Sequence, residues 1–389
     1  MKKIILFVAA IMILNSLFIP GAVAKASTNS PPSIVSEAAI VMDSETGSIL
    51  YAKNANKSMY PASLTKIATA IYAIEMGSLE STVTVSEKAR NIEGTRVFLE
   101  KGEQVTLKKL IQGLLINSGN DAGVAIAEHL SGSVEQFSSD LNNYLKNKIG
   151  LQQTHFENPH GLFDPSHVTT ARDLAKITQY AMKNDIFRDI FGTVELEWHG
   201  ESWDTTLLKH HKLVRQVIPY EGITGGKTGF VSKSGFTLAT TAKRNELSLI
   251  VITLNSNLQS NSYTDTKNLL DYGFKYFEQS TINKGTTFTT GGQTYKTSEK
   301  ITYTHQKGDQ ISEEINEDGT LEIIKHDGTV INSYQLDRDI EKEKMKEVNS
   351  VGNDVRTNSV FGEYIPMFVI TAIIIVLGFF FLFYRRTRN

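Results

Sequence analysis

Three short motifs follow one another along this chain of 389 residues, and they restrict it to folds that gather distant segments into one pocket. The motifs are Ser63-Leu64-Thr65-Lys66, Ser118-Gly119-Asn120 and Lys227-Thr228-Gly229. Together they supply a nucleophilic hydroxyl, a nearby amine, a hydroxyl–amide pair and a cation that can hold a carboxylate. This set of groups suits the opening of an amide bond beside a free carboxyl terminus through an acyl-enzyme.

The first motif provides a nucleophile and its base. Ser63 and Lys66 stand at positions i and i+3 of a predicted helix, so their side chains share one face. A lysine can act as a base only when it is neutral, and burial or a second cation lowers its pKa. We expect Lys227 to be that cation. In the alternative interpretation Ser63 only caps the helix and Lys66 is a surface residue.

The other two motifs are candidates for substrate contacts. Ser118 could deliver a proton to a leaving amine and Asn120 could hold a substrate backbone. The alternative is capping, with Asn120 or Asp121 starting the next helix. The Lys227 charge and the Thr228 hydroxyl suit a terminal carboxylate. Gly229 permits close approach on a predicted edge strand, which an extended peptide could join. A glycine-rich turn with an exposed lysine is the alternative here.

Composition excludes several classes of protein. The formal net charge of −2 gives no basic surface for nucleic acid. Cysteine is absent, so the fold relies on packing rather than disulfides and has no cysteine-ligated metal. We predict neither a cofactor nor a metal.

Both chain ends carry apolar segments. Residues 1–26 are typical of a cleaved signal peptide, with two lysines, an apolar run and small residues at 22–24, and an uncleaved anchor is the alternative. Residues 365–384 are uncharged and long enough to span a bilayer, and a buried core helix is the alternative. The arginines in the tail at 385–389 favour a cytoplasmic C-terminus. We therefore expect a single-pass membrane protein whose remaining part is extracytoplasmic.

Hydrophobic periodicity divides the exported part into two domains. Residues 33–280 are predicted to form an α/β (α+β) domain in which an antiparallel sheet uses both chain ends. Its strands are expected at 38–43, 48–53, 236–242 and 247–254, and its helices from 63 and at 107–115, 122–130, 134–148, 171–183 and 263–277. Residues 281–338 alternate as in hairpins and predict a small β-rich domain. A charged juxtamembrane linker is expected at 339–364.

At its motifs the chain resembles the serine-type D-alanyl-D-alanine carboxypeptidases, the low-molecular-mass penicillin-binding proteins. The resemblance extends from Ser36 to Ser280 and implies the fold of penicillin-recognising serine transferases and β-lactamases. The matching flanks are Tyr60-Pro61-Ala62, Asn117 to Ala122, Asn158-Pro159-His160-Gly161-Leu162, Thr170-Ala171-Arg172-Asp173 and Gly225 to Phe230.

The resemblance also implies roles for the motif residues. Ser63 would attack the carbonyl between the two terminal D-alanines of a peptidoglycan stem peptide, and Lys66 would take its proton. Ser118 would help to protonate the leaving D-alanine. Backbone N–H groups of Ser63 and Phe230 would form the oxyanion hole. β-Lactam antibiotics would inhibit by trapping Ser63 as a slowly hydrolysed ester.

Two further regions concern the surroundings of the predicted site: two residues that could support it, and one segment that differs from the family pattern. His160 and Asp173 are expected in a supporting shell around the site, with a loop residue and a helix-start acid as the alternatives. Where the family often has asparagines, this chain has Lys209-His210-His211-Lys212-Leu213-Val214, which makes substrate contacts there doubtful. We favour a surface or cleft-edge position for the two histidines over a metal site.

Other functions use the same motifs. A class A β-lactamase needs a glutamate-positioned water, and no Glu-x-x-x-Asn segment stands between the second and third motifs. A non-catalytic β-lactam sensor or wall-peptide binder would carry a signalling domain beyond the membrane span. A DD-endopeptidase is a further alternative. Residue types do not distinguish it from a carboxypeptidase, because both enzymes cleave after D-alanine.

Overall fold

The computed structural model describes residues 30–339, which form two compact units. Within that range the first unit contains residues 30–281 and 302–309, and the second contains residues 282–301 and 310–339. The predicted signal peptide, transmembrane helix and cytoplasmic tail lie outside the described residues, as does the linker beyond residue 339. Between residues 30 and 339, no helix has both the length and the hydropathy needed to cross a bilayer.

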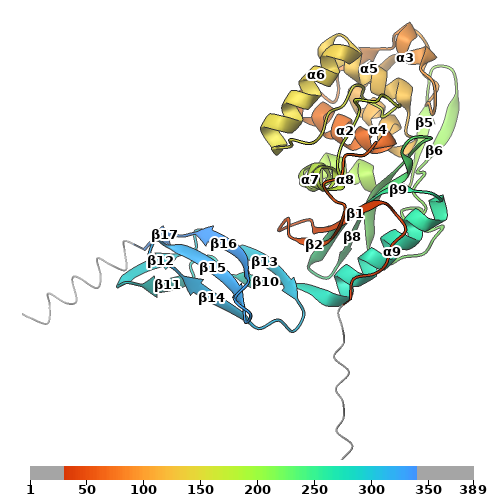
Figure 1. The fold of residues 1–389 in the computed structure, drawn as a ribbon. Helices are drawn as coiled ribbons and strands as arrows, with labels where there is room; N and C mark the ends of the chain where they lie inside the picture. Colours follow the sequence, from red (N-terminus) through yellow and green to blue (C-terminus); the bar gives the residue numbers. More distant parts are fainter. Residues whose placement is uncertain (1–29, 340–389) are drawn as a thin grey trace, which may run out of the picture. The chain divides into compact units, whose positions relative to one another are not determined.

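A five-stranded antiparallel sheet forms the frame of the first unit (Figure 1). Its strands are β1 (Ala38–Asp43), β2 (Ile49–Lys53), β7 (Ile223–Val231), β8 (Gly235–Arg244) and β9 (Leu247–Ser256). Their order is β2-β1-β9-β8-β7, so the first strand of the unit pairs with the last strand of the sheet. The predicted antiparallel sheet that uses both ends of the domain is therefore confirmed. The strand that carries the third motif, β7, lies at one edge.

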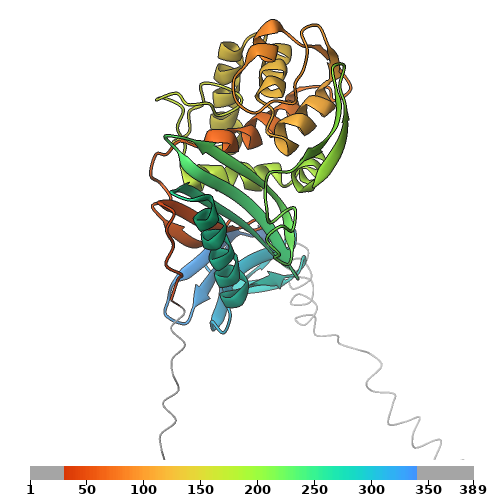
Figure 2. The same cartoon turned by 90° about the vertical axis from the view of Figure 1, so that its right-hand side faces the viewer.

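Alternate residues of the strands pack on opposite faces of the sheet. On one face Ile40 and Ile252 belong to a core shared with α7 (Ala171–Ala181) and the helices beyond it. On the other face Val41 and Val251 pack against α9 (Gln259–Tyr276), which Figure 2 shows along the sheet. Because both faces are covered, β1 is buried throughout, and its sequence is apolar without alternation up to its last residue, Asp43.

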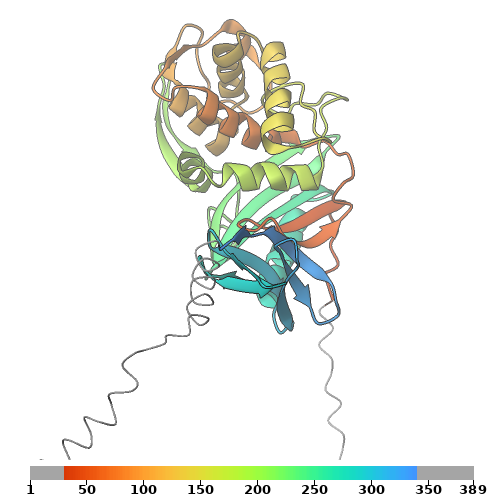
Figure 3. The same cartoon turned by 90° about the vertical axis from the view of Figure 1, so that its left-hand side faces the viewer.

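The helical cluster lies between β2 and β7 in the sequence, and Figure 3 shows α7 between this cluster and the sheet. Periodicity correctly predicts the long helices but not the short helices Glu87–Asn91 and Asp185–Gly192. It also misses two hairpins whose strands are short. The elements are η1 (Ala62–Leu64), α2 (Thr65–Met76), β3 (Thr82–Thr84), α3 (Glu87–Asn91), β4 (Gln104–Thr106), α4 (Leu107–Ile116), α5 (Asn120–Ser131), α6 (Val134–Tyr144), η2 (Leu145–Ile149), α8 (Asp185–Gly192), β5 (Glu195–His199) and β6 (Asp204–Leu208).

The second unit consists of short antiparallel strands joined by glycine turns, as the sequence predicts. Its strands are β11 (Thr287–Thr290), β12 (Gln293–Lys296), β14 (Ile311–Ile315), β15 (Thr320–Lys325), β16 (Val330–Gln335) and β17 (Asp337–Arg338). β10 (Phe277–Ile282) pairs with β13 (Ile301–Gln306) in a two-stranded sheet. The predicted β-rich domain at 281–338 included residues 302–309, but the structure groups these residues with the first unit. The reason is a buried contact: Thr304 Oγ1 donates to the Asp43 carboxylate at 2.6 Å.

Candidate active site

Ser63 lies in the tight turn η1, directly before α2. Ala62 in this turn has a φ of 49°, in the left-handed region that a residue with a Cβ seldom adopts. The turn is held in place by Gly161, because a Cβ built on that glycine would overlap the carbonyl oxygen of Ala62. Ser63 is half-buried, so its hydroxyl remains accessible.

The Lys66 amine is buried beside this hydroxyl. Its Nζ lies 2.9 Å from Ser63 Oγ and donates to Asn120 Oδ1 at 2.8 Å and to the His160 carbonyl oxygen at 2.7 Å. Burial lowers the pKa of Lys66 well below that of an ordinary lysine, and the charge of Lys227 lowers it further. A neutral amine with two N–H groups donated to carbonyl oxygens directs its lone pair at Ser63.

The second and third motifs meet through a hydrogen bond between their polar side chains. Lys227 Nζ donates to Ser118 Oγ at 2.9 Å and to the Thr228 carbonyl oxygen at 2.8 Å. Ser118 has a φ of 65°, a strained conformation of the kind that often occurs at functional sites. Lys227 is 2% exposed, and this burial lowers its pKa to about 7.

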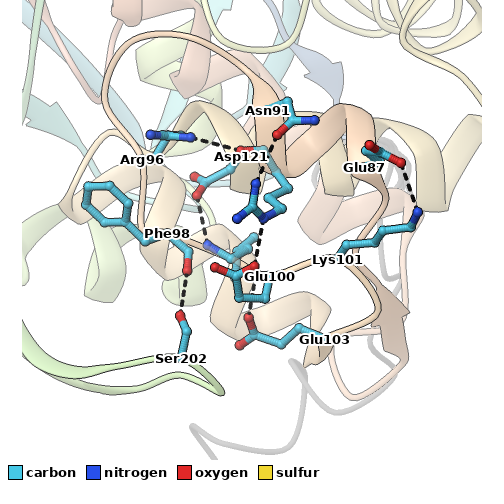
Figure 4. Close-up of polar contacts among 11 residues, drawn as sticks. Glu87, Asn91, Arg96, Phe98, Glu100, Lys101, Glu103, Asp121 and Ser202 are labelled. Carbon is cyan, nitrogen blue, oxygen red and sulfur yellow. Dashed lines mark hydrogen bonds and ion pairs between the residues drawn. The ribbon is translucent and has the colours of Figure 1, made fainter.

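Asp121, next to the second motif, organises the loop that borders the site (Figure 4). Its carboxylate accepts hydrogen bonds from the backbone N–H groups of Val97 at 3.0 Å and Leu99 at 3.2 Å. The backbone N–H of Asn120 donates to the Thr95 carbonyl oxygen at 2.7 Å. Residue type and spacing do not predict this role of Asp121. Its only sequence signal is an acid beside a catalytic motif, which helix capping explains equally well.

A cavity of about 350 Å³ opens over these groups. Residues from all three motifs line it, with His210 and the exposed Phe230. Gly229 permits this arrangement, because a Cβ on it would overlap Thr237 Oγ1 and lie 2.9 Å from the Ser63 nitrogen. The edge strand β7 therefore runs past the Ser63 backbone, and the cavity is bordered by a strand that a peptide could extend.

The structure separates the two residues expected in a supporting shell. His160 lies at the site, where its carbonyl oxygen contacts Lys66 and its ring nitrogen accepts from the Leu162 N–H at 3.3 Å. Asp173 contacts a different loop, and its supporting role stays a prediction. Its carboxylate accepts from Thr154 Oγ1 at 2.8 Å and from the Gln153 N–H at 3.2 Å, so it holds that loop.

The segment that departs from the family pattern is only partly at the surface. His210 lines the cavity, as the cleft-edge interpretation predicts. His211 is buried, with Nε2 2.9 Å from Thr240 Oγ1, and Lys209 is buried beside it in the sequence. Among residues 30–339 there is no group of histidine and acidic side chains that could hold a metal ion.

Comparison with known proteins identifies the family to which these motifs belong. The family model described as D-alanyl-D-alanine carboxypeptidase, peptidase family S11, matches residues 25–257. The chain belongs to this family. A relative from Bacillus subtilis, D-alanyl-D-alanine carboxypeptidase DacF, is 32% identical over 276 residues, which are 69% of this chain and 70% of the relative. DacA of Haemophilus influenzae is 34% identical over 269 residues, 64% of each chain.

Solved structures of penicillin-binding proteins show the same architecture. Penicillin-binding protein 5 from Haemophilus influenzae has a TM-score of 0.71 at 27% identity, covering 79% of this chain and 98% of that one. Penicillin-binding protein 6B from Escherichia coli has a TM-score of 0.67 at 27% identity and covers 79% and 96%. The chain thus has the penicillin-binding protein fold, with an α/β domain and a β-rich domain, and it is a serine-type hydrolase of this family.

The contact of Gly161 with the nucleophile turn leads to a testable prediction. In Gly161→Ala the new methyl group collides with Ala62, so Ser63 should move and kcat/KM should fall about 100-fold, the cost of a misplacement of about 1 Å. Gly132→Ala is the matched control, because Gly132 has a similar φ of 81° but nothing within 4 Å of a built Cβ. Equal activity of the two variants would contradict a role for Gly161 in positioning Ser63.

Proposed function

We propose that the protein is a membrane-anchored carboxypeptidase that removes the terminal D-alanine from peptidoglycan stem peptides through a Ser63 acyl-enzyme. One observation carries the proposal: the buried Lys66 amine lies 2.9 Å from Ser63 Oγ while its two N–H groups point at carbonyl oxygens. This geometry favours a neutral base that can deprotonate the hydroxyl. The family membership supports the substrate.

Acylation then follows from the arrangement of the site. The substrate carboxylate binds near Lys227 and Thr228, and the peptide extends β7. Ser63 Oγ attacks the carbonyl carbon of the penultimate D-alanine while its proton passes to Lys66. The oxyanion forms near the backbone N–H groups of Ser63 and Phe230, which are typically worth about 3–4 kcal/mol each.

The leaving group departs on the opposite side of the new ester. As the C–N bond breaks, the D-alanine nitrogen takes a proton from Ser118, which the Lys227 ammonium can replenish through its 2.9 Å contact with Ser118 Oγ. Water then hydrolyses the ester and restores the Ser63 hydroxyl. A β-lactam would acylate Ser63 in the same way, but its leaving group would stay attached to the acyl group. Penicillin should therefore label Ser63 stably.

The chain ends support a location at the membrane. The apolar segment 365–384 and the arginines that follow it favour a span with a cytoplasmic C-terminus. The signal-like segment 1–26 favours export of the intervening domains. The catalytic domain would thus work beside wall precursors in the extracytoplasmic space.

Release of D-alanine tests the substrate and the reaction together. The purified full-length protein should liberate free D-alanine from diacetyl-Lys-D-Ala-D-Ala and should be inhibited by penicillin. Stable penicillin labelling without release would instead indicate a sensor. Faster cleavage of a crosslinked stem-peptide dimer than of the tripeptide would indicate an endopeptidase.

The two buried lysines predict a bell-shaped pH dependence of kcat/KM. Activity should rise with pH as Lys66 loses its proton, because only the neutral amine is a base. It should fall above about pH 7 as free Lys227 loses the charge that holds the carboxylate. Lys227→Arg keeps that charge at high pH, so its alkaline limb should disappear in a pH–rate profile. An unchanged alkaline limb in this variant would contradict the assignment to Lys227.

A further inference from the structure

A third buried lysine, Lys209, lies behind the site and has no part in the proposed reaction. Its side chain is 1% exposed and forms no ion pair within residues 30–339. Its Nζ lies 3.4 Å from the Leu115 carbonyl oxygen, 3.5 Å from that of Ile190 and 5.3 Å from the centroid of the Phe191 ring. Because burial of an amine without a carboxylate is costly, these contacts must compensate for the lost hydration.

The two carbonyl groups share a structural position. Leu115 lies in the last turn of α4, and Ile190 lies in the last turn of α8. Carbonyl groups in the last turn of a helix form the negative end of its dipole and have few intrahelical partners. The Ile190 carbonyl oxygen also accepts the Thr193 N–H at 3.3 Å. Lys209 therefore joins the C-terminal ends of two helices with a single cation or hydrogen-bond donor.

Each of these helix ends leads directly to one partner of the Ser118–Lys227 hydrogen bond. Leu115 precedes Ser118 by three residues, and Ser118 adopts its strained conformation immediately after α4. On the other side, the Phe191 ring lies so close to Gly225 in β7 that a Cβ there would overlap it. Gly225 precedes Lys227 by two residues.

We propose that Lys209 is a positioning residue that fixes the Ser118 hydroxyl relative to Lys227 by joining the ends of α4 and α8. It does not line the cavity, so it acts through Ser118 rather than on the substrate. The activity readout of this inference rests on the proposed function. Loss of the Lys209 amine should loosen the end of α4 and misplace the proton donor for the leaving group.

Lys209→Met tests the proposal because methionine keeps the length of the side chain and removes the amine. We expect kcat for D-alanine release to fall about 10-fold or more with KM changed less than about twofold, as for a misplaced catalytic group. The melting temperature should not fall, since an apolar substitute for a buried charge is often neutral or stabilising.

Lys109→Met is the matched control. Lys109 also lies on α4, over the ring of Trp198 at 4.8 Å, and donates to the carbonyl oxygen of His199. Its contacts are with β5 rather than with the end of α4, so its kcat should equal that of the wild type. A loss of kcat in this variant equal to that of Lys209→Met would overturn the proposal.

A double-mutant cycle separates positioning from a general structural role. If Lys209 acts through Ser118, the Ser118→Ala/Lys209→Met variant should be no slower than Ser118→Ala alone. Multiplying losses, or a lower melting temperature with unchanged kcat, would overturn the proposal. If the wild type releases no D-alanine, the proposed substrate is wrong. The rate at which fluorescent penicillin labels the same variants then tests the role of Lys209. Slower labelling of Lys209→Met than of the wild type supports this role, and equal labelling overturns it.

Discussion

Replacement of Ser63 by alanine should abolish both D-alanine release and penicillin labelling. The variant lacks the hydroxyl that lies 2.9 Å from the Lys66 amine and would form the proposed acyl-enzyme, so kcat should fall by about four orders of magnitude or more, as for other serine nucleophiles. Binding of the peptide should persist, because Lys227 and Thr228 are untouched. The measurements are D-alanine release, penicillin labelling and binding of the peptide by calorimetry.

Ser166→Ala provides the control for the loss of a serine hydroxyl, since Ser166 is exposed in a loop outside the cavity. It should retain the activity of the wild type. Release of D-alanine by Ser63→Ala at the rate of the wild type would show that another group attacks the peptide.

Replacement of Lys66 by methionine should have the second largest effect. The Ser63 hydroxyl would lose its base, and general base catalysis typically contributes about 10²–10⁴-fold, so penicillin acylation should slow by that factor. Lys66→Arg should be equally impaired, because arginine keeps its proton at any pH that the fold tolerates. Acylation rates measured with a fluorescent penicillin across pH 5–10 would test both variants, and the ascending limb of the profile should vanish.

The exposed Lys108 supplies the control for loss of a lysine. Lys108→Met should leave the acylation rate and its pH profile unchanged. A Lys66→Met variant that acylates at the wild-type rate would show that a different group activates Ser63.

Local sequence patterns predict the reactive residues of the site better than they predict the residues that hold them in position. Ser63 and Lys66 are close in sequence, so helical spacing alone brings them together, and the structure places Nζ 2.9 Å from Oγ. The contact of Ser118 with Lys227 joins residues 109 positions apart, and only the recognised set of motifs predicted it.

The supporting residues act through backbone atoms and packing, which residue type does not reveal. His160 contributes a carbonyl oxygen to Lys66, and any residue type could supply that atom. Asp121 looks like a helix cap in the sequence, but its carboxylate holds the loop at 97–99. Lys209 looks like a surface residue and is buried. The role of each of these three residues depends on where a distant segment of the chain packs. Secondary-structure propensity and hydrophobic periodicity do not determine that packing.

The position of β7 at the margin of its sheet affects which molecules can reach Ser63. Within residues 30–339 only β8 pairs with this strand, so its outer edge can receive a peptide laterally. A tunnel would require the chain to be threaded from a free end, whereas a lateral entrance admits a short branch that remains attached to a long polymer. We therefore expect trimming of assembled, insoluble wall material as well as of monomeric precursors.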